Sequence, residues 1–210
     1  MVVSEAHQFV FVSNGKAAST SVEAVLSQYQ DRPDLNDHER AGYYTKRHMP
    51  AIELRLILGA ERWMHYISFA IVREPFAWFL SQVSYNVFNK RDLTMDVTAP
   101  LMADHVAECY DFLRKYRAQE ASPSATQWAH VCDQDGQLLV SALWRLEGLS
   151  ARWPQICRLL NIPEESLPSL NRSDSVVGAI PRLAPSGTTA VRELYAMDFD
   201  LYDAAEGVAR

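Results

Sequence analysis

The chain has 210 residues, 48% of them hydrophobic and 22% charged, which is enough for one well-buried domain over residues 1–210 and too few for two typical domains. Lys and Arg number 20 and Asp and Glu 26, so the formal charge is −6. This balance excludes an overall positive field for binding nucleic acid or an anionic membrane, so an anionic ligand would have to be held by local positive groups.

The apolar runs and the spacing of the cysteines bear on where the protein is expected to reside. No stretch approaches the roughly 18 apolar residues of a membrane span, and residues 1–8 do not resemble a signal peptide. The three cysteines, Cys109, Cys132 and Cys157, are widely spaced and fit neither a disulfide framework nor a metal-binding pair. We therefore expect a cytoplasmic protein with reduced cysteines in its core.

The apolar run over residues 9–12 is typical of a buried strand. After Ser13-Asn14-Gly15 the chain continues through Lys16 into a stretch whose apolar residues recur at helical spacing from Val22 to Tyr29. Backbone N–H groups at a helix N-terminus bind anions, and Lys16 adds a full positive charge there. The segment predicts a strand, a phosphate- or sulfate-binding loop and a helix.

This loop is not a complete nucleotide-triphosphate loop. That pattern needs two glycines and a hydroxyl residue directly after the Lys to hold Mg²⁺, whereas Ala17 follows Lys16. The missing Mg²⁺ ligand favours a less charged group, and a sulfuryl group fits. The other interpretation is an ordinary turn in which Thr20 is the N-cap and Glu23 completes a capping box.

The same strand–turn–helix pattern occurs again farther along the chain. A loop over residues 31–47 precedes a helix from Pro50 to about Gly59, and residues 66–72 form a second buried strand. Pro75 then begins another helix. The repeat predicts an α/β, P-loop-like three-layer fold, with a central parallel sheet flanked by helices and functional loops at the carboxyl ends of its strands.

The rest of the chain gives weaker signals. The expected elements are a loop over residues 90–100, a helix through 106–113, a strand over 140–146, a helix over 153–160 with Ser150 as N-cap, a loop over 171–187 and a last helix from Val191. The five tryptophans are expected mostly in the core. Asp198, Asp200 and Asp203 lack the spacing of a calcium loop and are interpreted as a solvated helix face, so no metal site is expected.

Arg73, at the end of the second strand, is the second candidate anion ligand. Ser81 lies six residues past Pro75, about 9 Å along a helix, so the long Arg73 side chain and the Ser81 hydroxyl could share one phosphate. The alternative interpretations are a salt bridge at the strand end for Arg73 and a solvated hydroxyl for Ser81.

Five segments, in chain order, resemble the motifs of sulfotransferases that use 3′-phosphoadenosine 5′-phosphosulfate (PAPS), best those of the carbohydrate-type, sulfotransferase family 2-like branch. The segments are Lys16 to Ser21 (K-x-x-[GS]-T-[ST]), Val72 to Phe76 with Leu80-Ser81 (V-R-[ND]-P-[FY] and [LV]-S), Arg145 to Leu149 (R-x-E-x-L), Leu170 to Ser173 (L-N-x-S) and Tyr195 to Phe199 (Y-x-x-D-[FY]). Mild departures from the family pattern occur at Gly15, Ser19 and Glu74, where the family often has Pro, Gly and Asn or Asp.

The resemblance implies a role for each matching residue. Lys16 would contact the sulfuryl group and its bridging oxygen, and Arg73 with Ser81 would hold the 3′-phosphate. The residues whose backbone and hydroxyls would hold the 5′-phosphosulfate are Ala17, Ala18, Ser19, Thr20 and Ser21. His48 resembles the histidine that related carbohydrate sulfotransferases place between their two cofactor motifs, and an ordinary imidazole accepts protons near neutral pH. His48 is therefore the candidate base, with a surface or helix-capping His as the alternative and His65 as the next candidate.

Taken together, the sequence predicts a sulfotransferase that moves a sulfuryl group from PAPS to a hydroxyl of a small molecule or glycan, leaving adenosine 3′,5′-bisphosphate (PAP). The acceptor groove would be built from residues 31–47, 88–100 and 171–187, where the sequence does not identify the acceptor. A P-loop kinase and a non-catalytic nucleotide-binding relative are the alternatives. The oligomeric state is open.

Overall fold

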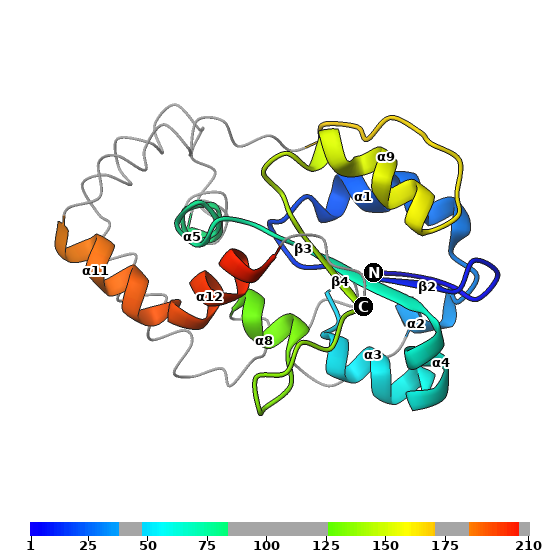
Figure 1. Ribbon diagram of the computed structural model, residues 1–210, viewed down its shortest axis with the longest axis horizontal. Helices are drawn as coiled ribbons and strands as arrows, with labels where there is room; N and C mark the ends of the chain where they lie inside the picture. The colour runs from blue at the N-terminus through cyan, green and yellow to red at the C-terminus, as the bar shows by residue number, and fades with distance from the viewer. Residues whose placement is uncertain (38–47, 84–125, 171–184, 206–210) are drawn as a thin grey trace.

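The computed structural model describes residues 1–37, 48–83, 126–170 and 185–205, and it shows an α/β fold around one sheet (Figure 1). Within these ranges the sheet consists of β1 (Val2–Ser4), β2 (Phe9–Val12), β3 (Ile67–Val72) and β4 (Ala142–Arg145), in that spatial order. β2, β3 and β4 are parallel, and β1 is antiparallel to β2.

The strand register brings the functional loops to one edge of the sheet. Val12 pairs with Ala70, and Val72 pairs with Arg145. The three parallel strands therefore end side by side, and the segments that follow β2, β3 and β4 all begin at this carboxyl edge. Ligands of open parallel sheets bind at this edge.

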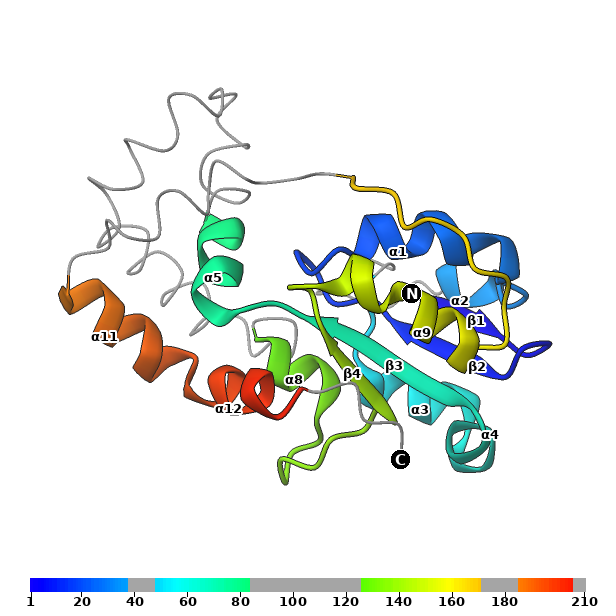
Figure 2. The same ribbon diagram turned by 45° about the horizontal axis from the view of Figure 1, so that its top comes forward.

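Alternation of side chains along the strands gives the sheet two buried faces. Phe9 and Phe11 of β2 point to one face, together with Phe69 and Ile71 of β3. Two helices cover this face, α1 (Ser19–Leu26) and α9 (Leu149–Leu159) (Figures 1 and 2).

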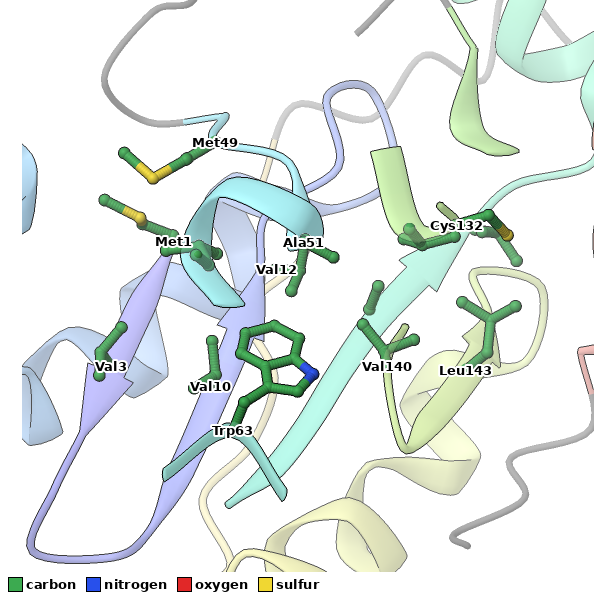
Figure 3. Packing of buried hydrophobic residues seen from close by; sticks show 14 of the residues in the cluster. Met1, Val3, Val10, Val12, Met49, Ala51, Trp63, Cys132, Val140 and Leu143 are labelled. Atoms are coloured by element: carbon green, nitrogen blue, oxygen red, sulfur yellow. The ribbon is translucent and has the colours of Figure 1, made fainter. Parts of the chain in front are cut away.

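The intervening strand residues, among them Val10 and Val12, face the opposite side. Figure 3 shows these valines packed with Trp63, Ala51 and residues near β4. The elements that cover this face are α3 (Ala51–Leu58), α4 (Ala60–His65), α8 (Gln127–Val131) and the short α2 (Asp34–Asp37), whose Leu35 is fully buried. The layers are therefore helix, sheet and helix, as predicted.

A third group of helices lies beyond the carboxyl edge. α5 (Pro75–Val83) continues from the end of β3, and α11 (Pro185–Leu194) and α12 (Ala196–Ala204) lie on the same side of the molecule (Figures 1 and 2). Aromatic rings join them: the ring centroids of Trp78 and Tyr195 are 5.6 Å apart, and those of Phe76 and Phe199 are 5.2 Å apart. These contacts fix α5 next to the end of the sheet.

Several expected elements are confirmed, and others differ. The strands ending near residues 12, 72 and 145 and the helix that begins at Pro75 are confirmed. The helix after β4 begins at Leu149, preceded by Gly148 in the left-handed region, so the assignment of Ser150 as N-cap is wrong. The expected loops over 31–47 and 171–187 contain α2 and the start of α11. The expected loop over 90–100 and helix through 106–113 lie outside the described residues.

The core follows the sequence interpretation closely. Trp63, Trp78, Trp144 and Trp153 are buried, as expected. Cys132 and Cys157 are buried and free, and Cys109 lies outside the described residues. In the part of the chain that the structure describes, no helix has the length and apolar character needed to cross a membrane.

Candidate active site

The loop after β2 is held by hydrogen bonds from three sides. The Gly15 carbonyl accepts from the indole N–H of Trp78 on α5 (2.9 Å), and the Asn14 amide donates to the carbonyl of Ile71 on β3 (3.2 Å). The Ser13 carbonyl oxygen lies within hydrogen-bond distance of two histidine rings. Because three consecutive residues are anchored, the backbone is fixed up to the point where Lys16 begins.

Lys16 and Ala18 both adopt left-handed backbone conformations, with φ of 62° and 58°. This region costs a non-glycine residue roughly 1–2 kcal/mol. Such conformations persist where surrounding structure imposes them, and they gather at ligand-binding sites. Here the anchored residues before Lys16 and the helix after Ala18 impose them.

Helix α1 begins at Ser19 with an uncapped N-terminus. Its N-cap is Ala18, no side chain accepts a hydrogen bond there, and its first helical bond runs from Val22 N–H to the Ala18 carbonyl (3.0 Å). The N–H groups of residues 19–21 therefore have no helical acceptor, the arrangement that binds anions. Thr20 lies inside the helix, so the capping-box interpretation is wrong.

Arg73 directly follows β3 at the same edge, and it is 7% exposed. The pKa of the Lys16 amine is lowered, mainly by burial and second by the positive charge of Arg73. Burial lowers the pKa of Arg73, while the carboxylates of Glu147 and Glu74 favour its charged form. The structure thus places the two predicted cations at one edge of the sheet, where the charge of Arg73 affects the Lys16 amine, although they are 57 positions apart in the chain.

Glu74 directly precedes α5, and Ser81 lies within it. A carboxylate oxygen of Glu74 accepts from the backbone N–H of Ala77 (2.8 Å), so Glu at this position caps the helix as a shorter acid would. Ser81 is 4% exposed, so its interpretation as a solvated hydroxyl is wrong.

His48 lies against the loop. Its Nδ1 is 2.8 Å from the carbonyl oxygen of Ser13, and because a carbonyl only accepts, this nitrogen carries the hydrogen. In the neutral ring the lone pair is then on Nε2. A Cβ placed on Gly15 would lie 3.9 Å from Nε2 and from Cε1, so the basic edge of the ring faces the residue next to Lys16.

A second histidine, His130 on α8, was not predicted. It is 2% exposed, and its Nε2 lies 3.1 Å from the same Ser13 carbonyl. Burial, and next the charge of His48, lower the pKa of His130 to about 3, so the ring stays neutral near pH 7. No sequence signal marked it, because its role depends on contacts between residues far apart in the chain. His65 is exposed on α4, at the opposite end of β3 from Arg73.

The later motif segments mainly join elements around this edge. Arg145 donates to the carbonyls of Tyr202 (2.9 Å) and Asp203 (2.8 Å) at the end of α12. Glu147 accepts from the Glu74 N–H (3.2 Å) and from the Tyr202 hydroxyl (2.9 Å). These bonds connect β4, α5 and α12.

Ser21 and Asp198 also have structural partners. The Ser21 hydroxyl oxygen accepts from the backbone N–H of Leu170 (3.1 Å), which ties the start of the L-N-x-S segment to α1. Asp198 is 1% exposed and accepts from the backbone N–H groups of Gln127 (3.2 Å) and Trp128 (2.8 Å). Its interpretation as part of a solvated helix face is therefore wrong. In the described ranges no group of three or more His, Cys, Asp or Glu residues is placed to hold a metal ion.

The fold and this edge define an α/β protein with a candidate anion-binding site, in which a lysine-bearing loop and a helix N-terminus lie near an arginine that follows the neighbouring strand. The chain belongs to the sulfotransferase family, whose model matches residues 1–203. Membership supports sulfuryl transfer as the general activity. Searches of curated proteins and of solved structures gave no match.

Proposed function

We propose that this protein transfers a sulfuryl group from PAPS to a hydroxyl group, with a carbohydrate or glycoconjugate as acceptor. The observation that carries the proposal is the proximity of Lys16 and Arg73, whose positive charges interact at the carboxyl ends of adjacent parallel strands. A buried Arg73 and a partly buried Lys16 close together favour a ligand with more than one anionic group. PAPS has such groups at both ends of its ribose.

The residues present fit this donor. The first-turn N–H groups of α1 have no side-chain cap, and the left-handed conformation of Ala18 leads directly into them. We assign the 5′-phosphosulfate to Lys16 and to residues 17–21, and the 3′-phosphate to Arg73 and Ser81. When bound, PAPS supplies the sulfuryl group, whose bond to the phosphate oxygen breaks as a bond to the acceptor oxygen forms.

The chain itself would supply a base, a charge and a fixed geometry. His48 Nε2 has the lone pair and faces the loop, so it is the atom we assign to take the proton of the acceptor hydroxyl. The Lys16 amine would balance the negative charge that develops on the leaving phosphate. The anchored loop holds both groups without rearrangement during the reaction.

Calorimetric titration tests the donor. PAP should bind more tightly than ADP or ATP–Mg²⁺, and the Arg73→Ala variant should lose this preference. A preference for ATP–Mg²⁺ would instead support a kinase. A transfer assay across sugars, glycolipids and small alcohols then separates an enzyme from a nucleotide-binding relative and identifies the acceptor class.

A further inference from the structure

Gln127, the first residue of α8, is a fully buried polar side chain at the junction of the two candidate anion loops. Its Oε1 accepts from the backbone N–H of Arg73 (2.8 Å), and its Nε2 donates to the Arg73 carbonyl (2.8 Å). The same Oε1 also accepts from the Asn14 amide (3.2 Å). One side chain therefore bonds to both backbone groups of Arg73 and to the loop that carries Lys16.

The Gln127 side chain takes the place of a neighbouring strand beside Arg73, just past the end of β3. β3 stops at Val72, and both backbone groups of the next residue bond to Gln127 as they would to a neighbouring strand. The backbone of Arg73 is thereby fixed, and the direction in which its side chain leaves the sheet is fixed with it.

Gln127 is itself held firmly. The two carboxylate oxygens of Asp198 accept from the backbone N–H groups of Gln127 and Trp128. The Thr126 hydroxyl accepts from the Ala129 N–H (3.0 Å). The first three N–H groups of α8 are therefore all bonded. These bonds fix the backbone of Gln127 and connect it to α12.

We propose that Gln127 is the positioning residue that sets Arg73 against the Lys16 loop, with Asp198 as its support. The inference rests on the proposed function, because the distance that it fixes is the distance between the sites for the 3′-phosphate and the 5′-phosphosulfate. Gln127 touches neither phosphate site directly in this assignment. Its effect passes through the backbone of Arg73 and the side chain of Asn14.

Ser141, which directly precedes β4, provides a control because its side chain also bonds to the β3 backbone. Its hydroxyl donates to the Ser68 carbonyl (2.8 Å) and accepts from the Ser68 N–H (2.9 Å), so it also pairs with both backbone groups of one β3 residue. Ser68 lies near the opposite end of β3 from Arg73. Ser141→Ala therefore removes the two side-chain bonds to the Ser68 backbone far from the site, while the Ser141 N–H still donates to the Ser68 carbonyl (2.9 Å).

The first measurement needs no ligand. Hydrogen exchange of the Arg73 backbone amide, followed by NMR, should speed up in Gln127→Ala and stay unchanged in Ser141→Ala. Gln127→Ala should also weaken binding of PAP about 10- to 100-fold, the equivalent of the roughly 1–3 kcal/mol lost when a buried hydrogen-bonding group loses its partner. Ser141→Ala should bind PAP as the wild type does.

Gln127→Glu adds a signature that a purely structural role would not give. A neutral carboxyl accepts from the Arg73 N–H and donates to its carbonyl, as the amide does, whereas an ionised carboxylate cannot donate. Burial and the nearby Asp198 carboxylate favour the neutral form, and the Arg73 guanidinium opposes it. Relative to the wild type at each pH, PAP binding by this variant should weaken as pH rises.

Each outcome decides one claim. Wild-type exchange at Arg73 and wild-type PAP affinity in Gln127→Ala would overturn the inference, as would equal losses of affinity in Gln127→Ala and Ser141→Ala. A wild-type protein that does not bind PAP would contradict the proposed function instead. In that case the exchange of the Arg73 amide still decides whether Gln127 holds this backbone.

Discussion

His48 and His130 share one hydrogen-bond acceptor, the carbonyl oxygen of Ser13, at 2.8 Å and 3.1 Å. The two rings come from segments 82 positions apart and meet at the residue that follows β2. Both bonds require a hydrogen on the nitrogen that faces the carbonyl, so they fix the tautomer of each neutral ring. His130 thereby helps to hold the carbonyl that orients His48.

His130 should make the protein less stable in mild acid. Its pKa is lowered to about 3 in the folded protein, against 6.5 in the unfolded chain, so its stabilisation is complete above pH 6.5 and is lost as pH falls toward 3. His130→Gln should reduce the drop in the free energy of unfolding between about pH 7 and about pH 5 by roughly 2 kcal/mol.

Urea unfolding at the two pH values measures this drop. The matched control is His65→Gln, which replaces an exposed histidine on α4 and should keep the wild-type drop. An unchanged drop in His130→Gln would show that His130 is not the neutral buried group described here.

His48 should be needed for turnover and dispensable for binding the nucleotide. His48→Ala removes the proposed base, so the transfer rate with saturating PAPS should fall by about 10²- to 10⁴-fold. Affinity for PAP should change little, because the assigned phosphate ligands remain. His65→Ala is the control and should keep full activity. A His48→Ala variant that turns over at the wild-type rate would remove His48 from the mechanism.

The left-handed conformation of Ala18 should cancel the usual destabilisation by glycine. Ala24→Gly, at an exposed position in the middle of α1, should lower the free energy of unfolding by about 1 kcal/mol. Ala18→Gly removes a Cβ from a residue with φ of 58°, which offsets the added freedom of the unfolded chain, so its stability should stay close to wild type. Chemical denaturation compares the two variants, and equal destabilisation would contradict the assigned backbone conformation.

Binding of PAP should take up a proton at alkaline pH. Burial and the charge of Arg73 lower the pKa of Lys16 in the free protein, and a bound anion would raise it again. Affinity should therefore fall as pH rises through the lowered pKa, below the ordinary value of 10.5. Calorimetry in buffers of different ionisation enthalpy measures the uptake. Lys16→Arg keeps a charge that does not titrate, so uptake at this site should disappear, and persistence of the full uptake would contradict the assignment.

The sequence predicted the elements whose signal is local. The apolar strands, Pro75 at a helix start and the strand–loop–helix order around Lys16 each depend on neighbouring residues, and these elements are confirmed in the structure. The cap assignments failed because Thr20 and Ser150 have the right residue type, while the helices begin earlier, after residues with positive φ. β1 is only three residues long and carried no apolar pattern that distinguished it.

The supporting residues of the site could not be predicted, because they act through tertiary contacts. Asn14, Gln127 and His130 look like ordinary polar residues in the sequence, yet all three are buried and bonded at the carboxyl edge. The acidic residues near Asp198 led to its interpretation as part of an exposed helix face. The packing of α12 against α8 buries it instead. The sequence marked residues within recognisable motif segments, such as Lys16 and Arg73, and not the polar residues that support them.

The most direct test of the account compares PAP with adenosine 5′-phosphate, which lacks the 3′-phosphate, by calorimetry. Arg73→Ala should weaken PAP binding by about 10- to 100-fold and leave adenosine 5′-phosphate binding nearly unchanged, because only the 3′-phosphate loses a charged partner. Lys16→Ala should weaken both ligands. Equal losses of affinity for the two ligands in Arg73→Ala, or no loss for either, would contradict the claim that Lys16 and Arg73 bind opposite ends of one nucleotide.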